Sequence, residues 1–392
     1  MRPSLALVDY VILAISLCLG TLSTALASPL YSLYILEWNI TTTQIGYAFI
    51  AYMFGVVFTL MFFNHFTLKY GFKKIVISGL VLIILGLIYS ALAQNIVELS
   101  LARFMLGVAS GFLSTATIVG LNLNYPFQNK MNSAKISSII TVFGFALGPI
   151  IGGIIADHTQ FPLKTPYYII ALASTVTLFF CFFIREKKNL EANNIHLKYW
   201  NYPKSKSNKN LFLVSSLSAF CCFSIFSLYA ALAGTFLSNL SLEKNATFTG
   251  LSISIILLIS TFTQLSSKKM PVFFSLKFGL KLITIGCFLL ILSLITQNIK
   301  YLTCSILFIG IGHGLALAPS YYFIEKIVKH ETSSIFSTFL LISYQGTIWP
   351  ILITSYLFDK IGNTYALAIF SLFILAMVIF LLHLIKKTNL KA

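Results

Sequence analysis

The chain has 392 residues, of which 58% are hydrophobic and only 9% are charged, and its mean hydropathy is +0.90. A soluble globular chain carries about 25% charged residues and could not bury this much apolar surface, so the composition excludes that class and indicates a polytopic membrane protein. The formal net charge is +17. We attribute it to membrane orientation, and we expect no nucleic-acid partner.

Hydropathy divides the chain into twelve apolar segments, each near the roughly 20 residues that a membrane-spanning helix requires. The first follows Arg2 but has no convincing cleavage region, so we interpret it as a retained helix rather than a signal peptide. The expected spans are 10–36, 43–64, 75–94, 97–121, 136–156, 166–184, 211–238, 247–267, 282–299, 301–324, 333–357 and 363–385. The predicted fold class is therefore an all-α integral membrane protein.

One connection is long, polar and basic. Residues 185–210 contain seven Lys or Arg residues and two Glu residues, which is typical of a flexible linker. We expect this segment to join an N-terminal six-helix bundle, 1–184, to a C-terminal six-helix bundle, 211–392.

The charge distribution predicts the orientation of these spans. If the N-terminus is cytoplasmic, the cytoplasmic segments carry +17 in total and the outer segments carry −1, and Arg103 within a span supplies the remaining +1. Cytoplasmic loops of membrane proteins are enriched in Lys and Arg. The asymmetry predicts an even number of spans with both termini inside, and the compact length suits a bacterial inner (plasma) membrane.

The two halves contain similar short segments. Leu-Lys-Tyr-Gly-Phe-Lys at 68–73 recurs as Leu-Lys-Phe-Gly-Leu-Lys at 276–281, and Gly46 and Gly250 lie near the starts of the corresponding predicted helices. Internal repeats with a binding cavity between them are the architecture of alternating-access transporters. The repeat therefore predicts two related bundles.

The segment 136–156 contains an unusual run of small residues, Gly-Phe-Ala-Leu-Gly-Pro-Ile-Ile-Gly-Gly. Glycines four residues apart allow a neighbouring helix to approach closely, and a proline bends the helix by removing a backbone hydrogen bond. Ordinary small-residue packing would explain a bare GxxxG. The full run resembles the antiporter motif on the fifth helix of major facilitator superfamily exporters, in the drug/proton antiporter branch. Its residues are Gly144, Gly148, Pro149, Gly152 and Gly153.

The resemblance implies the major facilitator fold, alternating access and a proton gradient as the energy source. The segment from Leu99 to Gly111 is similar to the superfamily pattern L-x-x-x-R-x-x-x-G-x-x-x-G, with Arg103, Gly107 and Gly111 in its fixed places. By resemblance, Arg103 acts in substrate or proton coupling. A charge inside a span faces a cavity or a partner, and Gly107 and Gly111 follow on the same helix face. The alternative is that the side chain snorkels to the outer surface.

The loop after the second span resembles the superfamily's G-x-x-x-D-R-x-G-R-K signature. Lys69, Gly71 and Lys73 fit the first basic, the glycine and the final basic places, whereas Leu68 replaces the acid and Phe72 an arginine. The tight turn favours glycine because it accepts positive φ. An ordinary basic turn is the alternative to a gating role for these lysines.

Other polar side chains are candidates for the substrate and proton pathway. His313 is flanked by glycines and has a side chain that titrates near neutral pH; the alternative is a neutral histidine bonded to a neighbouring helix. Tyr31 and Tyr34 lie on one helix face and line either the pathway or an outer interfacial belt. Gln345 and Trp349 lie one turn apart, and ordinary helix packing is their alternative role.

No Asp or Glu lies deep in any predicted span. A cavity with Arg103 and no acid repels cations and suits neutral or anionic solutes, such as a drug, a carboxylate-bearing metabolite or a siderophore. The leading hypothesis is therefore proton-coupled efflux of such a molecule. An uptake symporter of the same fold is the alternative.

The sequence contains no catalytic, nucleotide-binding or metal-binding motif, which argues against a membrane enzyme. The six cysteines lie in apolar spans and are interpreted as small buried hydrophobic residues. We accordingly expect no catalytic residues, no metal and no cofactor. The expected partners are a small-molecule substrate and membrane lipid, and we expect the protein to act as a monomer.

Overall fold

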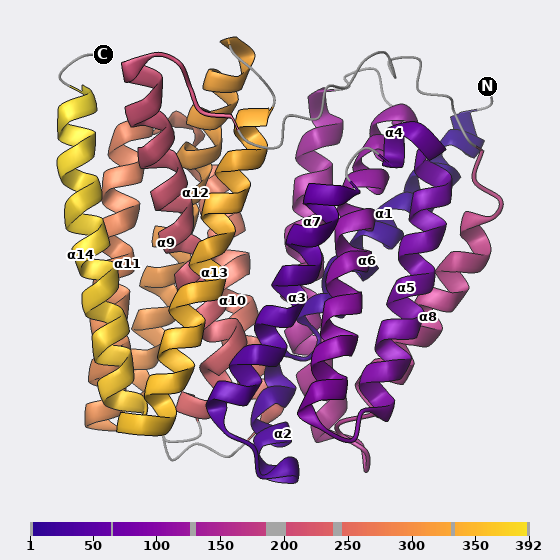
Figure 1. The fold of residues 1–392 in the computed structure, drawn as a ribbon, viewed down its shortest axis with the longest axis horizontal. Coiled ribbons are helices and arrows are strands. Elements are labelled where there is room, and N and C mark those ends of the chain that lie inside the picture. The colour runs from indigo at the N-terminus through magenta and orange to yellow at the C-terminus, as the bar shows by residue number, and fades with distance from the viewer. Residues whose placement is uncertain are drawn as a thin grey trace. The chain divides into compact units, whose positions relative to one another are not determined.

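The computed structural model describes residues 3–63, 66–125, 131–185, 201–237, 245–330 and 334–389. All regular elements in these ranges are helices (Figure 1). The first half contains α1 (Pro3–Ala25), a 3₁₀ turn η1 (Ser28–Leu30), α2 (Tyr31–Trp38), α3 (Thr42–Phe62), α4 (Phe66–Tyr70), α5 (Phe72–Leu92), α6 (Ile96–Leu123), α7 (Met131–Asp157) and α8 (Thr165–Cys181). The second contains α9 (Lys206–Leu237), α10 (Ala246–Ser266), the 3₁₀ turn η2 (Ser267–Lys269), α11 (Val272–Thr296), α12 (Ile299–His330), α13 (Ser334–Ile361) and α14 (Asn363–Asn389).

In the described part of the chain, eleven helical segments are long and apolar enough to cross a membrane. The first of them, Leu7–Trp38, combines most of α1 with η1 and α2. The remaining predicted span corresponds to α8, which has 17 residues. At 1.5 Å per residue it is about 25 Å long, slightly less than a typical hydrocarbon core of about 30 Å. The all-α integral membrane fold predicted from the sequence is confirmed.

Several helix boundaries differ from the sequence-based expectation, and the start of α11 differs most. Helix α11 begins at Val272, ten residues earlier than expected, because Lys277 and Lys281 lower the local hydropathy without preventing helix formation. Helix α9 begins at Lys206, so the end of the predicted linker is helical. Most of that linker, residues 186–200, lies outside the described residues.

The chain divides into two compact units. The first consists of Met1–Ile40, Tyr47–Ile195 and Asn245–Ser254, and the second of Thr41–Gly46, His196–Lys244 and Ile255–Ala392. In the first unit α1 packs against α6 and α7, and α5 packs against α6 and α8. In the second, α9 packs against α12 and α13, and α11 packs against α12 and α14. The first residues of α3 and of α10 thus belong to a different unit from the rest of the same helix.

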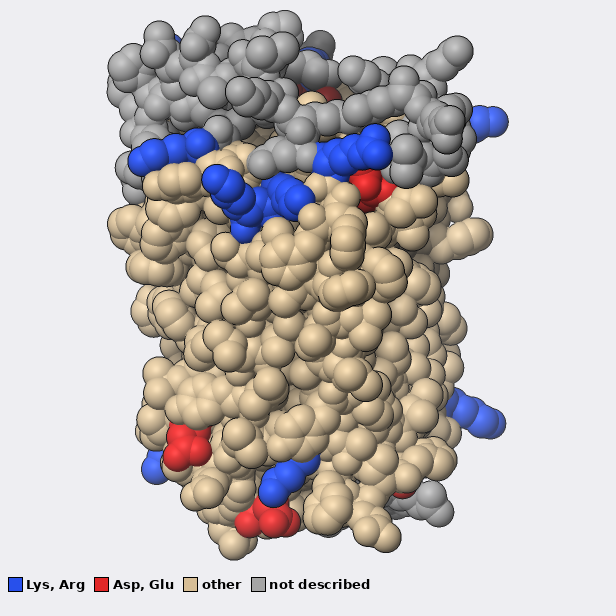
Figure 2. Space-filling view, turned by 90° about the vertical axis from the view of Figure 1, so that its right-hand side faces the viewer, with Lys and Arg blue, Asp and Glu red and all other residues tan. Residues whose placement is uncertain are grey.

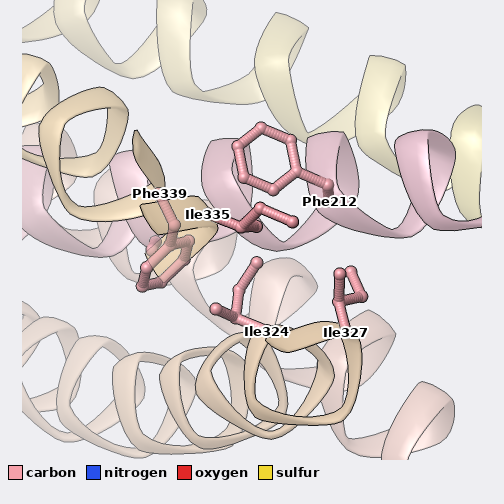
Figure 3. Close-up of a cluster of buried hydrophobic side chains, with 6 residues drawn as sticks. Phe212, Ile324, Ile327, Ile335 and Phe339 are labelled. Atoms are coloured by element: carbon pink, nitrogen blue, oxygen red, sulfur yellow. The ribbon is translucent and has the colours of Figure 1, made fainter. Parts of the chain in front are cut away.

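An apolar cluster holds three helices of the second unit together (Figure 3). Phe212 of α9, Ile324 and Ile327 of α12, and Ile335 and Phe339 of α13 are all at most 2% exposed. Because lipid tails are as apolar as these side chains, close packing rather than the hydrophobic effect accounts for most of their contribution to stability.

The surface is consistent with a chain embedded in lipid. On the face drawn in Figure 2, a broad band of uncharged residues separates charged side chains at one end, most of them Lys or Arg, from charged side chains of both signs at the other. Many exposed side chains are large and apolar, including Leu172, Phe262 and Leu372, each more than 60% exposed. In water such a surface would aggregate.

Candidate functional site

Arg103 is completely buried. Helix α6 is capped by Asn95, whose side chain accepts hydrogen bonds from the backbone N–H groups of Val97 and Glu98. Arg103 follows about two turns later with 0% of its surface exposed. Its Nε and Nη1 atoms have no hydrogen-bond partner in the described part of the chain. The snorkelling alternative is therefore wrong, because a snorkelling side chain reaches the surface.

Tyrosine side chains surround the buried guanidinium. Its central carbon lies 5.2 Å from the ring centroid of Tyr52 on α3, within cation–π range. It also interacts electrostatically with the hydroxyls of Tyr31, Tyr34, Tyr52 and Tyr167. We call these four residues and Arg103 the Arg103–tyrosine cluster. All five belong to the first unit.

The tyrosines of the cluster are held by one another. The Tyr34 hydroxyl donates a hydrogen bond to that of Tyr167 on α8, at 3.1 Å. Tyr31 and Tyr34 on α2 are each 1% exposed, so the interfacial-belt interpretation is wrong. The Tyr31 hydroxyl is buried and has no hydrogen-bond partner among the described residues. The cluster therefore contains unused donors on both Arg103 and Tyr31.

Arg103 forms no ion pair with any described residue. A buried, unpaired cation is costly, and tyrosine rings and hydroxyl dipoles compensate only part of that cost. A guanidinium presents a fork of N–H donors that matches a carboxylate or phosphate. The arrangement can bind an anionic group and stack an aromatic ring beside it.

Two glycines of α6 allow α3 to approach Arg103. A Cβ atom at Gly107 would collide with the backbone carbonyl of Tyr52, and one at Gly111 would lie 2.6 Å from the Thr59 side chain. Thr59 Oγ1 donates to the carbonyl of Val108 at 3.2 Å, which joins the same two helices. The glycine spacing that the sequence identified thus positions Tyr52 over the guanidinium.

The glycines of the predicted antiporter motif form a stripe along α7. A Cβ atom at Gly148 would lie 2.6 Å from the Leu22 carbonyl oxygen of α1. Gly144 approaches the carbonyl of Cys18 on α1 in the same way, and Gly152 approaches that of Leu26, the residue that follows α1. Three carbonyls spaced four residues apart thus face three glycines spaced four apart. Such contact allows Cα–H···O interactions and excludes any side chain.

Pro149 and Gly153 connect α7 to the start of α10 within the first unit. A Cβ atom at Gly153 would collide with the Ala246 carbonyl, and one at Gly250 would collide with the carbonyl of Pro149. Ser254 Oγ also donates to the Ala146 carbonyl at 2.6 Å. The motif therefore has two packed faces, one against α1 and one against α10.

His313 on α12 lies in the second unit and is 4% exposed. Its Nδ1 atom is 2.7 Å from Ser260 Oγ on α10, and Gln264 Nε2 donates to the same hydroxyl at 3.1 Å. The hydrogen bond to a neighbouring helix, one of the two roles expected from the sequence, is present. Whether His313 also carries a proton during transport stays a prediction.

The remaining sequence candidates do not join the cluster. Gln345 on α13 is half-buried and accepts a 2.8 Å hydrogen bond from the indole of Trp349, which is 57% exposed. Near α4, Lys69 lies 5.1 Å from the Tyr70 ring centroid, and Lys73 donates to the Phe182 carbonyl at 2.8 Å.

Gly71 precedes α5 with φ of 87°, which confirms that this turn requires positive φ. The Leu68 side chain lies outside the described residues.

Sequence reasoning missed Tyr52 and Tyr167. Each is a tyrosine within an apolar span, and the chain contains 19 tyrosines, so composition alone does not single them out. The signal available was Tyr52's position one turn before Gly55, which faces Gly107. No group of three or more metal-ligating side chains occurs within the residues that the structure describes.

Membrane-length helices with internal prolines, close glycine contacts and a buried charge are typical of multi-pass secondary transporters. The family model described as Major Facilitator Superfamily matches residues 13–349. The chain therefore belongs to the major facilitator superfamily and is a transporter, not an enzyme.

Curated relatives match over parts of their length. The chain is 26% identical to the riboflavin transporter RibZ of Clostridioides difficile over 170 residues, covering 41% of this chain and 37% of RibZ. It is 23% identical to multidrug resistance protein 2 of Bacillus subtilis over 201 residues, covering 50% and 49%. The matches thus span less than half of these relatives.

Solved transporters share the fold over almost the whole chain. A bacterial homologue of the human lysosomal transporter Spinster superposes with a TM-score of 0.77 at 11% identity, covering all of this chain and 98% of that one. The nucleoside transporter NupG gives a TM-score of 0.77 at 12% identity, covering 96% of this chain and 99% of NupG. These likenesses concern the fold alone.

Proposed function

We propose that this transporter exports a small neutral or anionic molecule in exchange for protons. The single observation that carries the choice of substrate is the Arg103–tyrosine cluster, in which a fully buried guanidinium has two nitrogens without a partner in the described part of the chain. A second cation brought beside Arg103 would be repelled in a medium of low dielectric constant. A carboxylate or phosphate would instead satisfy the open donors.

The tyrosine rings support a ring-containing solute. Tyr31 and Tyr52 supply aromatic surface, and Tyr31 supplies a hydroxyl that is not otherwise bonded among the described residues. The relative named as a riboflavin transporter and the one named as a multidrug resistance protein both support a drug-like or metabolite-like substrate. A siderophore with carboxylate groups meets the same requirements.

Export coupled to protons is supported by the resemblance of the α7 run to the antiporter motif. The geometry adds that the glycines of α7 lie directly against the backbone of α1 and of α10, so a small rotation of α7 moves both neighbours. His313 is the proposed proton carrier, because it places a titratable imidazole between α12 and α10, in contact with Ser260. No cofactor is required, since the proton gradient supplies the energy.

The experiment is transport into proteoliposomes of one orientation with an imposed pH gradient. A panel should contain matched anionic, neutral and cationic aromatic solutes of similar size, and each should be assayed with and without a proton uncoupler. We expect uncoupler-sensitive antiport of anionic or neutral members. Robust transport of the cationic members would contradict the proposal. Substrate flux in the same direction as protons would show that the protein is an uptake symporter rather than an exporter.

Localisation and assembly can be tested on the same protein. We propose a bacterial inner-membrane location, cytoplasmic termini and a functional monomer. A reporter that is active only in the cytoplasm should be active when it is fused after residue 203 or after residue 389. The detergent-solubilised transporter should have the mass of one chain. An external linker would invalidate the orientation.

A further inference from the structure

Two aspartates bind the starts of two helices in the same manner. Asp157, the last residue of α7, accepts hydrogen bonds from the backbone N–H groups of Ala246 at 3.0 Å and Thr247 at 2.7 Å. These are the first two residues of α10. Each carboxylate oxygen accepts one of these two hydrogen bonds. Asp157 therefore joins the end of α7 to the start of α10, although Asp157 and Ala246 are 89 residues apart in the sequence.

Asp359 repeats this arrangement in the second unit. It lies near the end of α13 and accepts from the backbone N–H groups of Thr42 at 2.9 Å and Thr43 at 2.8 Å, the first two residues of α3. Both pairs of contacts lie within a single unit, the first for Asp157 and the second for Asp359.

Glycines bring the helices together beside each aspartate. Gly153, one turn before Asp157, lies against the backbone of Ala246. Gly46, one turn after Thr42, lies against Ser355, which is one turn before Asp359. Each aspartate thus lies at the end of a line of close contact between two helices, which we call a seam. A side chain at the glycine would force the two helices of the seam apart.

The chemistry makes these contacts strong but reversible. The first N–H groups of a helix have no partner within the helix, and they carry the positive end of its dipole. A carboxylate that accepts from two of them forms charge-assisted hydrogen bonds without a buried cation. When the helices separate, water can replace the carboxylate at both ends.

We propose that Asp157 and Asp359 are paired latches that close the transporter on one side and release when it changes conformation. Each latch joins helices that the sequence assigns to different halves of the chain, α7 with the start of α10 and α13 with the start of α3, and a conformational change that separates the two helices breaks the bonds. The charge asymmetry predicts that both latches face the external side. Their role does not depend on the substrate or on proton coupling.

The two latches differ in strength. Thr43 Oγ1 also donates to Asp359, at 2.5 Å, whereas Thr247 Oγ1 is buried without a hydrogen-bond partner among the described residues. Asp359 therefore holds its helix with one more hydrogen bond.

The test compares Asp157→Asn, Asp359→Asn and the double variant in the full chain. Glu98→Gln is the matched control, because Glu98 accepts from Gln94 N–H and Asn95 Nδ2 at the start of its own helix and joins no second helix. Hydrogen–deuterium exchange should accelerate roughly tenfold at 42–43 in Asp359→Asn and at 246–247 in Asp157→Asn, since each loses charge-assisted bonds. Asp359→Glu, which retains both oxygens, should restore part of the protection.

Accessibility then distinguishes a latch from a local helix cap. Ser355→Cys and Ser254→Cys place thiols at fully buried positions beside the two seams. A membrane-impermeant maleimide should label the thiol at 355 several-fold faster in Asp359→Asn, and the thiol at 254 several-fold faster in Asp157→Asn. Both thiols should react fastest in the double variant. The chain without either added cysteine is the blank for labelling of the native cysteines. Faster exchange without faster labelling, or changes no larger than those of Glu98→Gln, would overturn the proposal. Neither readout requires a substrate, so failure of the proposed transport reaction would be seen separately.

Discussion

Arg103 and His313 occupy comparable surroundings in the two units but differ in chemistry. Helix α6 packs on α3 through Gly107 and Gly111, and α12 packs on α10 through Gly310 and Gly314. In both helix pairs a GxxxG spacing brings a polar side chain deep into the protein. The packing is shared between the halves, whereas the buried polar group is not.

The difference lies in how each polar group is satisfied. His313 is bonded to Ser260 and can be neutral, so it costs little to bury. Arg103 keeps its charge in any protein environment, and two of its nitrogens have no partner within the described residues. One unit thus holds a permanent charge and the other a titratable group, and the proposed function assigns the first to the substrate and the second to the proton.

The largest expected effect is that of removing the permanent charge. Arg103→Gln should reduce transport of anionic solutes by about 100-fold, because loss of one partner of a buried charge pair costs several kcal/mol. Arg103→Lys should retain part of the flux, since it keeps the charge but not the fork. Initial rates at equal amounts of folded protein provide the measurement.

Thermal stability serves as the control for this variant. An unpaired buried cation destabilises the empty transporter, so Arg103→Gln should unfold at the same or a higher temperature than the parent chain. A large loss of stability would show that Arg103 is a structural residue, and unchanged flux of anionic solutes would contradict its assignment to the substrate.

The next effect concerns the α7 stripe. Gly148→Val should reduce flux at least tenfold while membrane insertion is retained, because its Cβ would lie 2.6 Å from the Leu22 carbonyl and force α1 and α7 apart. Pro149→Leu should act in the same direction by straightening α7. Ile154→Val, at an exposed position of the same helix, is the control. Equal flux of all three variants would exclude a gating role for the stripe.

His313 should show a selective effect on coupling. His313→Gln preserves a polar partner for Ser260 but cannot titrate, so exchange of substrate across the membrane should continue while accumulation driven by a pH gradient falls about tenfold. The assay compares substrate counterflow with gradient-driven transport in the same vesicles. Undiminished gradient-driven transport would mean that another group carries the proton. The substrate site and the proton site would then not be assigned to different units.

The sequence predicted the elements that depend on local pattern. Apolar runs located the spans, the Arg103 pattern singled out a charge in a helix, and Gly71 was recognised from the turn that it forms. The start of α11 was placed too late because a hydropathy window penalises Lys277 even where it lies at a helix end.

Contacts between distant segments were not predictable in this way. Tyr167 meets Tyr34 across 133 residues, and no local property marks either as a partner of Arg103. Asp157 and Asp359 lie at the ends of predicted spans, and no local property of the sequence shows that each binds a helix start elsewhere in the chain. Such pairings follow from the packing of glycine-lined helices, which a single sequence specifies without revealing which helices meet.

The smallest effect on function is expected from the apolar cluster of the second unit (Figure 3). Phe339→Ala should lower the free energy of unfolding by about 3 kcal/mol, because it leaves a cavity between α9, α12 and α13. Phe336→Ala, one turn away and 37% exposed, should cost much less. Thermal unfolding of both variants provides the measurement.

Flux per folded molecule should change little in Phe339→Ala, since the Arg103–tyrosine cluster belongs to the first unit and His313 is not a member of the apolar cluster. A loss of flux as large as that of His313→Gln would show that packing in the second unit sets the coupling. The contrast between the units would then lie in rigidity rather than in the chemistry of their buried polar groups.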